Sequence, residues 1–245
     1  MSEIEKLREK LRKLHLSAMA RELDGILKQC RDKNLDQLAT LERLADIELD
    51  QRYRQAVELR YRQSHLREKL TIDAFDFHHH KSRMDQKQPI LSLLSLEFIH
   101  AHGDAILIGN PGTGKTFLAK CVAHAACLAN LKVLFTTAIE MINHLIAAEA
   151  DRSLIRKLRF YQSPDLLVCD ELGYLALGPQ GSHLFFQVIS QRHQQRSTLV
   201  TTNLPFADWG KVFDSTTVAT AIADRLVHNS EVLILGGPSY RRKQR

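Results

Sequence analysis

The stretch "AILIGNPGTGKTFLAKCVAHAA" constrains this chain more than any other. Within it, Gly109, Gly114, Lys115 and Thr116 fit the pattern of a glycine, four residues, a second glycine, a lysine and a serine or threonine. A short apolar run precedes the pattern, and an amphipathic helical run follows it. Glycines let backbone N–H groups curl around phosphate oxygens without Cβ clashes, and the start of a helix favours negative charge. The stretch therefore predicts a phosphate-binding loop between a strand and a helix.

The residues of this loop have distinct expected roles. Lys115 is expected to reach the β- and γ-phosphates of a nucleotide, and Thr116 is expected to bind Mg²⁺. ATP and Mg²⁺ are therefore the expected ligands. The expected nucleotide-binding residues are Gly109, Asn110, Pro111, Gly112, Thr113, Gly114, Lys115, Thr116 and Phe117.

A second motif, "PDLLVCDELGYL", places two acidic residues at the end of an apolar run. In open α/β sheets, ligands bind at the carboxyl ends of the strands. There Asp170 would hold Mg²⁺, mostly through water, and Glu171 would orient and polarise the attacking water. An acidic pair that only caps a turn is the alternative. Together with the phosphate loop, the pair predicts ATP hydrolysis and argues against a small-molecule kinase, whose acceptor is a substrate hydroxyl.

Two further polar residues lie in positions that leave alternatives open. Asn203 follows the apolar run of "STLVTTNLPFADWG", where its amide can orient water between Glu171 and the γ-phosphate; a turn-forming asparagine is the alternative. Arg225 lies within a predicted helix beside Asp224, so on pattern alone it could be a surface charge or a salt-bridge partner.

Five short apolar segments alternate with helical segments over residues 89–245. They are "AILIG", "KVLFTT", "DLLVCD", "STLVTTN" and "EVLILGG". Strands that alternate with helices indicate a parallel sheet with helices on both faces. The predicted fold class of this domain is therefore α/β, a P-loop NTPase with a parallel sheet flanked by helices.

Residues 1–70 have a different character, with no proline and one glycine, Gly25. Leucines at helical spacing predict one helix in "KLREKLRKLHLSAMARELDGIL" and two more in "LDQLATLERLADIELDQRYRQAVELRYRQSHLREK". We therefore expect a small all-α N-terminal domain over 1–70. The stretch "DAFDFHHHKSRMDQKQP" shows no helical period, and residues 71–88 are interpreted as a linker. Its three histidines, His78, His79 and His80, fit a polar linker better than a metal site, since no spaced partner is near them.

The chain is basic, with a formal net charge of +6 and a sequence pI of about 9.2. An excess of this sign favours a polyanion such as nucleic acid or an acidic membrane surface. The predicted helix that ends near residue 69 is rich in arginine, which suits either a solvated face or a surface that follows phosphates.

The cysteines and the hydropathy of the chain indicate its cellular compartment. The four cysteines lack metal-ligand spacing and are expected to be reduced core thiols of a cytoplasmic protein. They are Cys30, Cys121, Cys127 and Cys169. The first ten residues are charged throughout, and no run approaches the roughly 18 apolar residues of a membrane span, so no membrane association is expected.

Seven segments along the chain match in order, and through them the chain resembles the IstB-type ATP-binding helper proteins of bacterial insertion sequences. That family is a branch of the AAA+ ATPases related to the helicase loader DnaC. The matching segments are "LRKLHLSAMARELD", "FDF", "GNPGTGKTFLAK", "DELGYLAL", "TTNLPFADWGKVF", "ADRLVHNSEVLILGG" and "SYR". The resemblance implies a self-assembling ATPase that binds and remodels double-stranded DNA and directs a partner transposase.

The resemblance also implies roles for individual residues. Asn203 falls at the sensor-1 position, Arg225 at the arginine finger that completes a neighbouring subunit's site, and Arg241 at the sensor-2 arginine. The segment "AIEMINHLIAAEADRSLIRKL" resembles the extra helix of the initiator and loader branch, which commonly faces DNA. Its expected DNA contacts are Arg152, Arg156, Lys157 and Arg159.

Three alternative functions stay open at this point. A DnaC-like replicative helicase loader shares the ATPase domain but prefers single-stranded DNA, and the N-terminal segment together with "NLPFADW" favours the transposition helper. A small-molecule phosphotransferase would need a substrate pocket and a lid, for which we find no motif. A scaffold that binds nucleotide without hydrolysis is disfavoured by the intact Lys115, Asp170 and Glu171.

Overall fold

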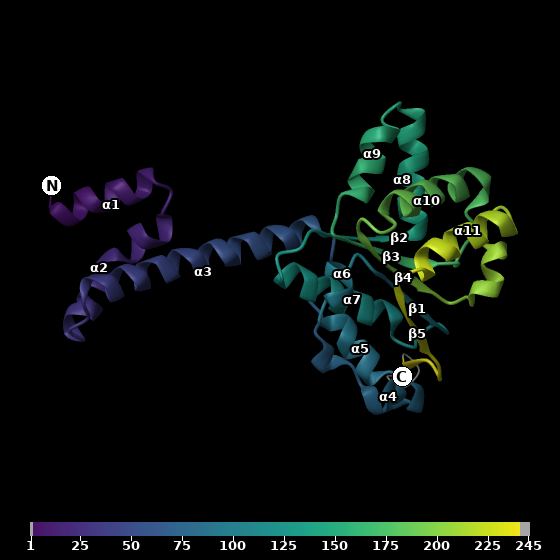
Figure 1. The fold of residues 1–245 in the computed structure, drawn as a ribbon, viewed down its shortest axis with the longest axis horizontal. Helices are drawn as coiled ribbons and strands as arrows, with labels where there is room; N and C mark the ends of the chain where they lie inside the picture. The colour runs from purple at the N-terminus through teal and green to yellow at the C-terminus, as the bar shows by residue number, and fades with distance from the viewer. Residues whose placement is uncertain (1, 241–245) are drawn as a thin grey trace. The chain divides into compact units, whose positions relative to one another are not determined.

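The computed structural model describes residues 2–240, and the chain forms two compact units. The first unit ends at Leu59 and the second begins at Arg60, whereas the sequence placed the change of character near residue 70. Figure 1 shows helices in the first unit and a sheet between helices in the second.

The first unit contains α1 (Glu3–Lys13), α2 (Ser17–Asp32) and most of α3 (Gln37–Gln63). The predicted helical character is confirmed, but the breaks differ. The helix expected over 6–27 is interrupted by His15, which has a φ of +58°, and the two helices expected over 35–69 form one. Neither glycine nor proline marks the break, so the local signals for a helix end were absent. The core of this unit consists of Leu11, Ala20, Leu23, Ile26, Cys30 and Leu44.

Glu48 of α3 is buried and caps α2. Its carboxylate accepts hydrogen bonds from the backbone N–H groups of Ala18 at 2.8 Å and Met19 at 3.2 Å, and pairs with Arg52 at 3.0 Å. Burial raises the pKa of Glu48, but the hydrogen bonds from Arg52, Met19 and Ala18 outweigh it and hold the pKa below its ordinary value. Because α2 has no side-chain cap at Leu16, Glu48 supplies the negative charge that a helix N-terminus favours.

A parallel five-stranded sheet forms the centre of the second unit, in the order β2-β3-β4-β1-β5. Each strand coincides with one of the five predicted apolar segments, so the α/β prediction is confirmed. Because all the strands run in parallel, their carboxyl ends share one edge of the sheet. The strands are β1 (Asp104–Gly109), β2 (Val133–Thr137), β3 (Leu166–Leu172), β4 (Ser197–Thr202) and β5 (Ser230–Leu235).

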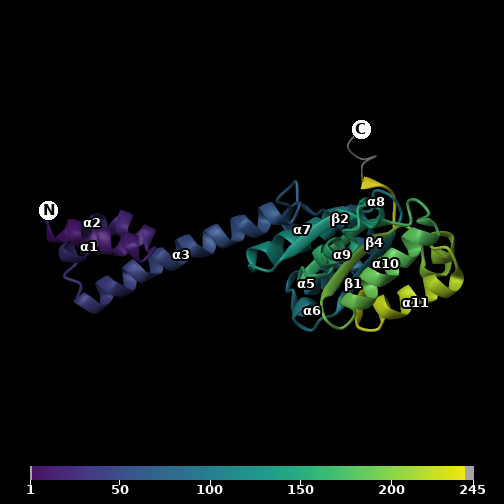
Figure 2. The same ribbon diagram turned by 90° about the horizontal axis from the view of Figure 1, so that it is seen from above.

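Helices cover both faces of this sheet, as Figures 1 and 2 show. One face packs against α8 (Ala138–Ala150), α9 (Leu154–Gln162), α10 (Gly178–Arg192) and α11 (Thr216–Val227). The other packs against α5 (Lys87–Leu94), α6 (Glu97–His100) and α7 (Lys115–Leu128). Strands buried on both faces need continuous apolar runs, which is why the five segments stand out in the sequence. Within residues 2–240, no helix is long and apolar enough to cross a membrane.

Residues 71–88, interpreted from the sequence as a linker, are packed into the second unit. Phe75 and Arg83 are buried, and the Ser82 hydroxyl accepts a hydrogen bond from the backbone N–H of Gly236 at 2.8 Å. The segment shows no helical period because its helical pieces are each a turn or so long. They are the 3-10 helices Ile72–Ala74 and Phe77–His79, and α4 (Lys81–Asp85).

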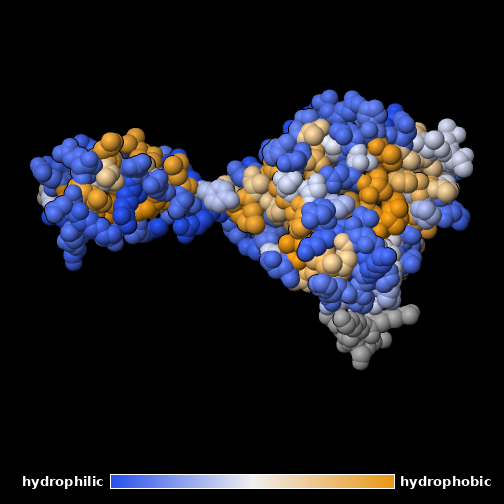
Figure 3. Space-filling view, turned by 60° about the horizontal axis from the view of Figure 1, so that its bottom comes forward, coloured by the Kyte–Doolittle hydropathy of each residue, from blue (hydrophilic) through white to orange (hydrophobic). Residues whose placement is uncertain are grey.

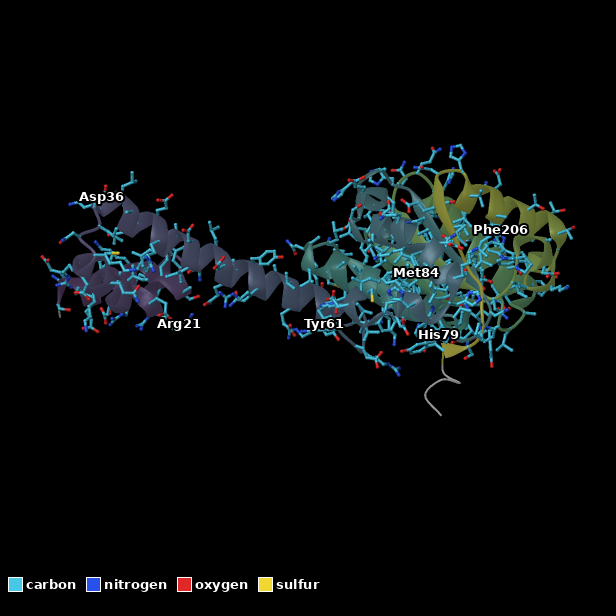
Figure 4. All side chains as sticks on the ribbon, turned by 90° about the horizontal axis from the view of Figure 1, so that it is seen from below. Arg21, Asp36, Tyr61, His79, Met84 and Phe206 are labelled. Atoms are coloured by element: carbon cyan, nitrogen blue, oxygen red, sulfur yellow. The ribbon has the colours of Figure 1, made fainter. Side chains whose placement is uncertain are left out.

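The histidine run contacts the protein itself. His79, labelled in Figure 4, packs edge-on against Tyr240 with 4.9 Å between ring centres, and its Nε2 lies 3.4 Å from the carbonyl oxygen of Pro238. His80 Nδ1 accepts a hydrogen bond from the Ser82 N–H at 3.1 Å and so caps α4. Among the described residues, no group of three or more His, Cys, Asp or Glu side chains is arranged to hold a metal ion.

Arg192, at the end of α10, is a buried charge at the edge where the strands begin. Its guanidinium donates to acceptors at the end of α9, in the following loop and at the start of β4. These acceptors are the carbonyl oxygens of Tyr161, Gln162, Pro164 and Ser197 and the hydroxyl of Thr198. Asp104 of β1 is also buried, and its Oδ1 accepts from the Thr198 N–H at 2.6 Å. Burial raises the pKa of Asp104 to about 7, against the Thr198 hydrogen bond and the charge of Arg192.

The cysteines are free and buried, as the sequence predicts. All four thiols lie in the interior, Cys30 in the first unit and the other three in the second. Burial raises the pKa of Cys121 to about 12, which keeps the thiol protonated and unreactive at neutral pH.

Candidate nucleotide-binding site

The predicted phosphate loop connects β1 to α7 at the carboxyl edge of the sheet. Gly112 and Gly114 have φ values of +82° and +106°, which residues with a side chain rarely adopt. A Cβ on Gly112 would lie 2.0 Å from the Ser239 hydroxyl oxygen, and one on Gly114 would lie 2.7 Å from the Phe75 ring. The loop is therefore a backbone cradle that only glycine permits, and this cradle fits phosphate oxygens.

Lys115 begins α7 and lies over the loop. Its Nζ donates hydrogen bonds to the carbonyl oxygens of Gly109 at 2.7 Å and Asn110 at 3.0 Å. The buried Thr113 tightens the same turn, because its hydroxyl donates to the Asn110 carbonyl oxygen at 2.9 Å. The ammonium group is thus held beside the cradle, where phosphates would bind.

Asp170 of β3 joins the loop to the sheet. It is buried, and its Oδ1 accepts hydrogen bonds from the Thr116 hydroxyl at 3.0 Å and from the Thr201 hydroxyl of β4. Hydroxyl and carboxylate oxygens are the ligands that Mg²⁺ prefers. The structure therefore brings the two predicted metal ligands, Thr116 and Asp170, into direct contact.

Glu171 follows Asp170 but is exposed. Its φ is +61°, and the pairing of β3 with β4 shifts register between Cys169 and Leu172. Its backbone N–H donates to the Thr201 hydroxyl at 3.0 Å, so Thr201 contacts both acidic residues. This irregularity lets one carboxylate lie inside the sheet and the next one face water, which suits a metal ligand followed by a base.

A cavity of about 300 Å³ lies between these motifs. Lys115, Thr116, Glu171 and Asn203 all line it. Asn203 is the residue immediately after β4 and is half-buried. The structure therefore brings the residue expected at the sensor-1 position to the same cavity as the loop and Glu171.

A second cavity, of about 290 Å³, also borders Lys115. Its walls include the rings of Phe75, Phe117 and Tyr240 and the guanidinium of Arg83. Aromatic rings and a guanidinium plane suit a flat, planar group such as a nucleobase. Sequence reasoning missed Phe75, Arg83 and Tyr240 as residues that line this cavity. Phe75 and Tyr240 lie in the matching segments "FDF" and "SYR", whereas Arg83 lies in none of them.

Arg83 anchors this second cavity. Its guanidinium donates hydrogen bonds to the carbonyl oxygens of Thr113 and Asp76, both at 2.9 Å. It also lies 4.5 Å from the Phe75 ring centre and 5.0 Å from that of Tyr240. Burial lowers the pKa of Arg83, against the charge of Asp76, but a guanidinium remains charged at neutral pH. One side chain thus ties residues 71–88 to the phosphate loop.

The two remaining arginines of the predicted site are placed differently. Arg225 lies on α11, half-buried, with its guanidinium 4.6 Å from the Phe186 ring centre and donating to the Ala221 carbonyl oxygen at 2.8 Å. Among the described residues, those that line the two cavities do not include Arg225. Its role in a neighbouring subunit stays a prediction. Arg241 lies outside the described residues.

The predicted DNA contacts lie on α9 and in the turn before it. Arg152 lies in the turn before this helix with a φ of +57°, and Arg156 and Arg159 are exposed on it. Lys157 places its ammonium 5.2 Å from the ring centre of Phe160. The four charges therefore lie within one short segment of the chain, and their contact with DNA stays a prediction.

Comparison with known proteins agrees with this geometry. The sequence profile of the family described as "IstB-like ATP binding protein" matches residues 9–245. The chain is 34% identical to the insertion sequence IS5376 ATP-binding protein of Geobacillus stearothermophilus, over 98% of this chain and 95% of the relative. It is also 34% identical to the insertion sequence IS21 ATP-binding protein of Pseudomonas aeruginosa, over 100% of this chain and 91% of the relative.

Solved structures share the fold at lower identity. The DnaC helicase loader matches with a TM-score of 0.58 and 20% identity, over 67% of this chain and 96% of that chain. DnaA from Aquifex aeolicus, bound to AMPPCP, matches with a TM-score of 0.57 and 15% identity, over 68% of this chain and 50% of that chain. These similarities concern the fold, and they confirm the predicted AAA+ P-loop NTPase type.

Proposed function

Because this chain belongs to the family of IstB-like ATP-binding proteins, we propose that it is a DNA-binding ATPase that assists transposition. The observation that carries the proposal is the convergence of Lys115, Thr116, Asp170 and Glu171 at one edge of the sheet. The glycine cradle and Lys115 bind the phosphates of ATP, which accords with the names of the relatives. Thr116 and Asp170 would hold Mg²⁺, which would supply positive charge to the phosphate oxygens when bound.

Hydrolysis requires a base that can reach water, and Glu171 meets this need. Its carboxylate is exposed on the cavity that Lys115 and Asn203 also line. Glu171 polarises the attacking water, and the amide of Asn203 orients it. A positioned general base contributes about 10²–10⁴-fold to a rate, so Glu171 alone separates a fast enzyme from a nucleotide-binding scaffold.

Self-assembly completes the site in this proposal. Arg225 of one copy reaches the γ-phosphate bound by its neighbour, and Arg241 reads the γ-phosphate in its own chain. An arginine finger is worth about 10³–10⁵ in rate among phosphate-loop enzymes. Because each interface then depends on the γ-phosphate, assembly and nucleotide state are linked.

Double-stranded DNA is the proposed partner of the assembled protein. Arg152, Arg156, Lys157 and Arg159 provide positive charge on and beside α9, and the whole chain carries +6. Bending a 20–30 bp site costs about 1–6 kcal/mol, which several phosphate contacts can offset. The remodelled duplex marks a target for a partner transposase in the cytoplasm, and hydrolysis then releases the complex.

Two substitutions test the ATPase proposal. Glu171→Gln should bind ATP normally but lower turnover by about 100-fold or more, since it removes the base and spares the cradle. Lys115→Ala should lose ATP binding itself. Calorimetry measures binding and phosphate release measures turnover, each with and without duplex DNA. Glu97→Gln, which changes an exposed glutamate of α6, is the matched control. Normal turnover by Glu171→Gln would contradict the assignment of the base.

The helicase-loader alternative is separated by the DNA that the protein prefers. With ATP, the transposition helper should bind duplex more tightly than single strands, and affinity should fall steeply between 50 and 200 mM salt. A preference for single strands would favour the loader.

Arg225→Ala should abolish DNA-stimulated turnover but spare ATP binding, and normal hydrolysis by this variant would contradict the assignment of Arg225 as the arginine finger.

A further inference from the structure

A cavity of about 320 Å³ lies within the second unit, between the last turn of α3 and the start of β2. It shares no lining residue with the two cavities of the nucleotide site. Its volume falls in the range of about 300–1,000 Å³ that is typical of ligand sites. We call it the β2-edge cavity. The polar side chains that line it are those of Arg60, Gln63, His65, Lys132 and Ser163.

The β2-edge cavity offers hydrogen-bond donors and positive charge. Each of its five polar side chains can donate a hydrogen bond, and Arg60 and Lys132 carry a positive charge. None of the described residues that line it is acidic. A set of this kind fits an anion that has several acceptor oxygens and no donor. The phosphodiester group of a nucleic acid is such an anion.

Backbone and side-chain contacts fix the walls of this cavity. The Nε of Arg60 donates to the carbonyl oxygen and to the Oδ1 of Asn130, both at 3.1 Å. The buried Ser64 accepts a hydrogen bond from the N–H of Phe135 in β2 through its carbonyl oxygen, at 2.8 Å. Residues 60–66 are therefore held along β2, which is an edge strand of the sheet. An anion that enters such a preformed site loses less affinity to ordering of the protein.

The cavity is continuous with the positive charge of α9. Phe160 of α9 forms part of its wall, and the ring of His65 lies 6.1 Å from the ring of Phe160 between centres. Lys157 places its ammonium 5.2 Å from the same ring centre. At 1.5 Å per residue, Arg156 and Ser163 are about 10 Å apart along the chain, which is the rise of about three base pairs. Neighbouring phosphates of one duplex can therefore meet both α9 and the cavity.

Charge, rather than hydropathy, distinguishes this site from the rest of the surface. Figure 3 shows patches of hydrophobic residues among hydrophilic ones on the face of the second unit that it presents. An apolar patch alone does not specify the chemistry of a partner. A cavity that has two cations and no acidic wall selects a partner of negative charge.

We propose that the β2-edge cavity binds a backbone phosphate of double-stranded DNA, as a contact additional to those of α9. The inference rests on the DNA-binding part of the proposed function. It adds a direction, because the duplex follows α9 from Arg152 toward Ser163 and the start of β2. Since a phosphate carries no sequence information, this contact positions the duplex without favouring a sequence.

The salt dependence of DNA binding by the full chain tests this contact. Lys132 is exposed, and its backbone N–H, which donates to Asp165 at 2.9 Å, is unaffected by a change of side chain. With ATP, Lys132→Gln should lower duplex affinity about five- to tenfold at 0.1 M salt and reduce the slope of log K against log salt by about 0.9. Lys132→Arg should restore both. Lys81→Gln is the matched control, since α4 lies beside β5 at the opposite edge of the sheet.

Arg156→Ala separates failure of this inference from failure of the proposed function. If Arg156→Ala reduces the slope but Lys132→Gln behaves like Lys81→Gln, the cavity holds no DNA phosphate and the inference is overturned, while DNA binding through α9 stands. A flat salt response of the unsubstituted protein would overturn DNA binding and this inference together.

Acylation of the Lys132 ammonium, followed by mass spectrometry, identifies what covers the cavity. Duplex with ATP should slow the reaction at least about threefold, because the bound phosphate occupies the ammonium. ATP alone, or inorganic phosphate at the same ionic strength, should not, and Lys81 should react equally throughout. Protection by ATP alone would assign the cavity to a contact between copies of the chain. Stronger protection by inorganic phosphate than by duplex would make it a site for a free anion, and either result would overturn the proposal.

Discussion

Replacing Arg83 with alanine tests whether the segment before the ATPase core is part of the nucleotide site. Arg83 was absent from every motif in the sequence, yet it is buried and donates hydrogen bonds to the carbonyl oxygens of Thr113 and Asp76. It also lies against the rings of Phe75 and Tyr240. Arg83→Ala removes all of these contacts at once, so both stability and nucleotide affinity should fall.

The size of the stability loss follows from these contacts. A hydrogen bond from a charged donor is worth about 1.5–3 kcal/mol, and a cation–π contact about 0.5–2 kcal/mol. The adjacent cavity of about 290 Å³ admits water to the carbonyl groups that lose their donor, which offsets part of the loss. We therefore expect the free energy of unfolding to fall by about 3 kcal/mol, or Tm to fall by about 6–12 °C for a unit of this size. ATP affinity should fall about tenfold, because Thr113 belongs to the phosphate loop.

Denaturant unfolding and ATP titration calorimetry measure the two effects. Lys81→Ala, an exposed position of the same short helix, is the control and should change stability by less than about 0.5 kcal/mol. If Arg83→Ala lies within about 0.5 kcal/mol of that control, the guanidinium does not anchor the loop and the reasoning is refuted. Lower stability with unchanged ATP affinity would restrict Arg83 to a structural role.

Three other substitutions probe contacts seen in the structure. Thr201→Val removes the hydroxyl that contacts Asp170 and Glu171. Turnover of ATP should fall about 10–100-fold, while ATP affinity should change less than about threefold. Unchanged turnover would show that the hydroxyl is dispensable. Since burial raises the pKa of Asp104 from 3.8 to about 7, stability should fall as pH rises through that window, and Asp104→Asn should remove this slope in unfolding titrations. Because the pKa of Glu48 is lowered in the folded protein, its ionised carboxylate stabilises the fold at neutral pH. This stabilisation is lost as the pH falls below 4.5, the ordinary pKa of a glutamate. Glu48→Gln should therefore weaken hydrogen-exchange protection of α2 by about 1 kcal/mol at pH 7, with less further loss in acid; protection that falls equally in both proteins would contradict this.

The parts of the site that could be predicted are those whose residues are adjacent in the sequence. The phosphate loop depends on the spacing of glycines beside Lys115, and Asp170 and Glu171 follow directly on an apolar run. The strands were recognisable for the same reason, since burial on both faces leaves an uninterrupted apolar segment. What the sequence could not show was the contact between Thr116 and Asp170, which joins residues 54 positions apart.

The missed residues depend on pairing between distant segments. Thr201 meets Asp170 across two strands, 31 positions apart, and Arg83 meets Thr113 from 30 positions away. Neither residue has a local pattern that distinguishes it from an ordinary threonine or a surface arginine. The break at His15 was missed for a related reason, because a single residue in a left-handed conformation interrupts a run of residues that all suit a helix.

The five acceptors around Arg192 have a consequence for how this protein can change over generations. They belong to two separate stretches of chain, 161–164 and 197–198, and only arginine offers five N–H donors in one plane. Lysine cannot replace it, and a smaller residue would leave several buried carbonyl groups without a donor. A compensated replacement would require coordinated changes in both stretches, which single mutations do not supply. Although Arg192 lies at the edge of the sheet away from the phosphate loop, its position should be among the least free to drift.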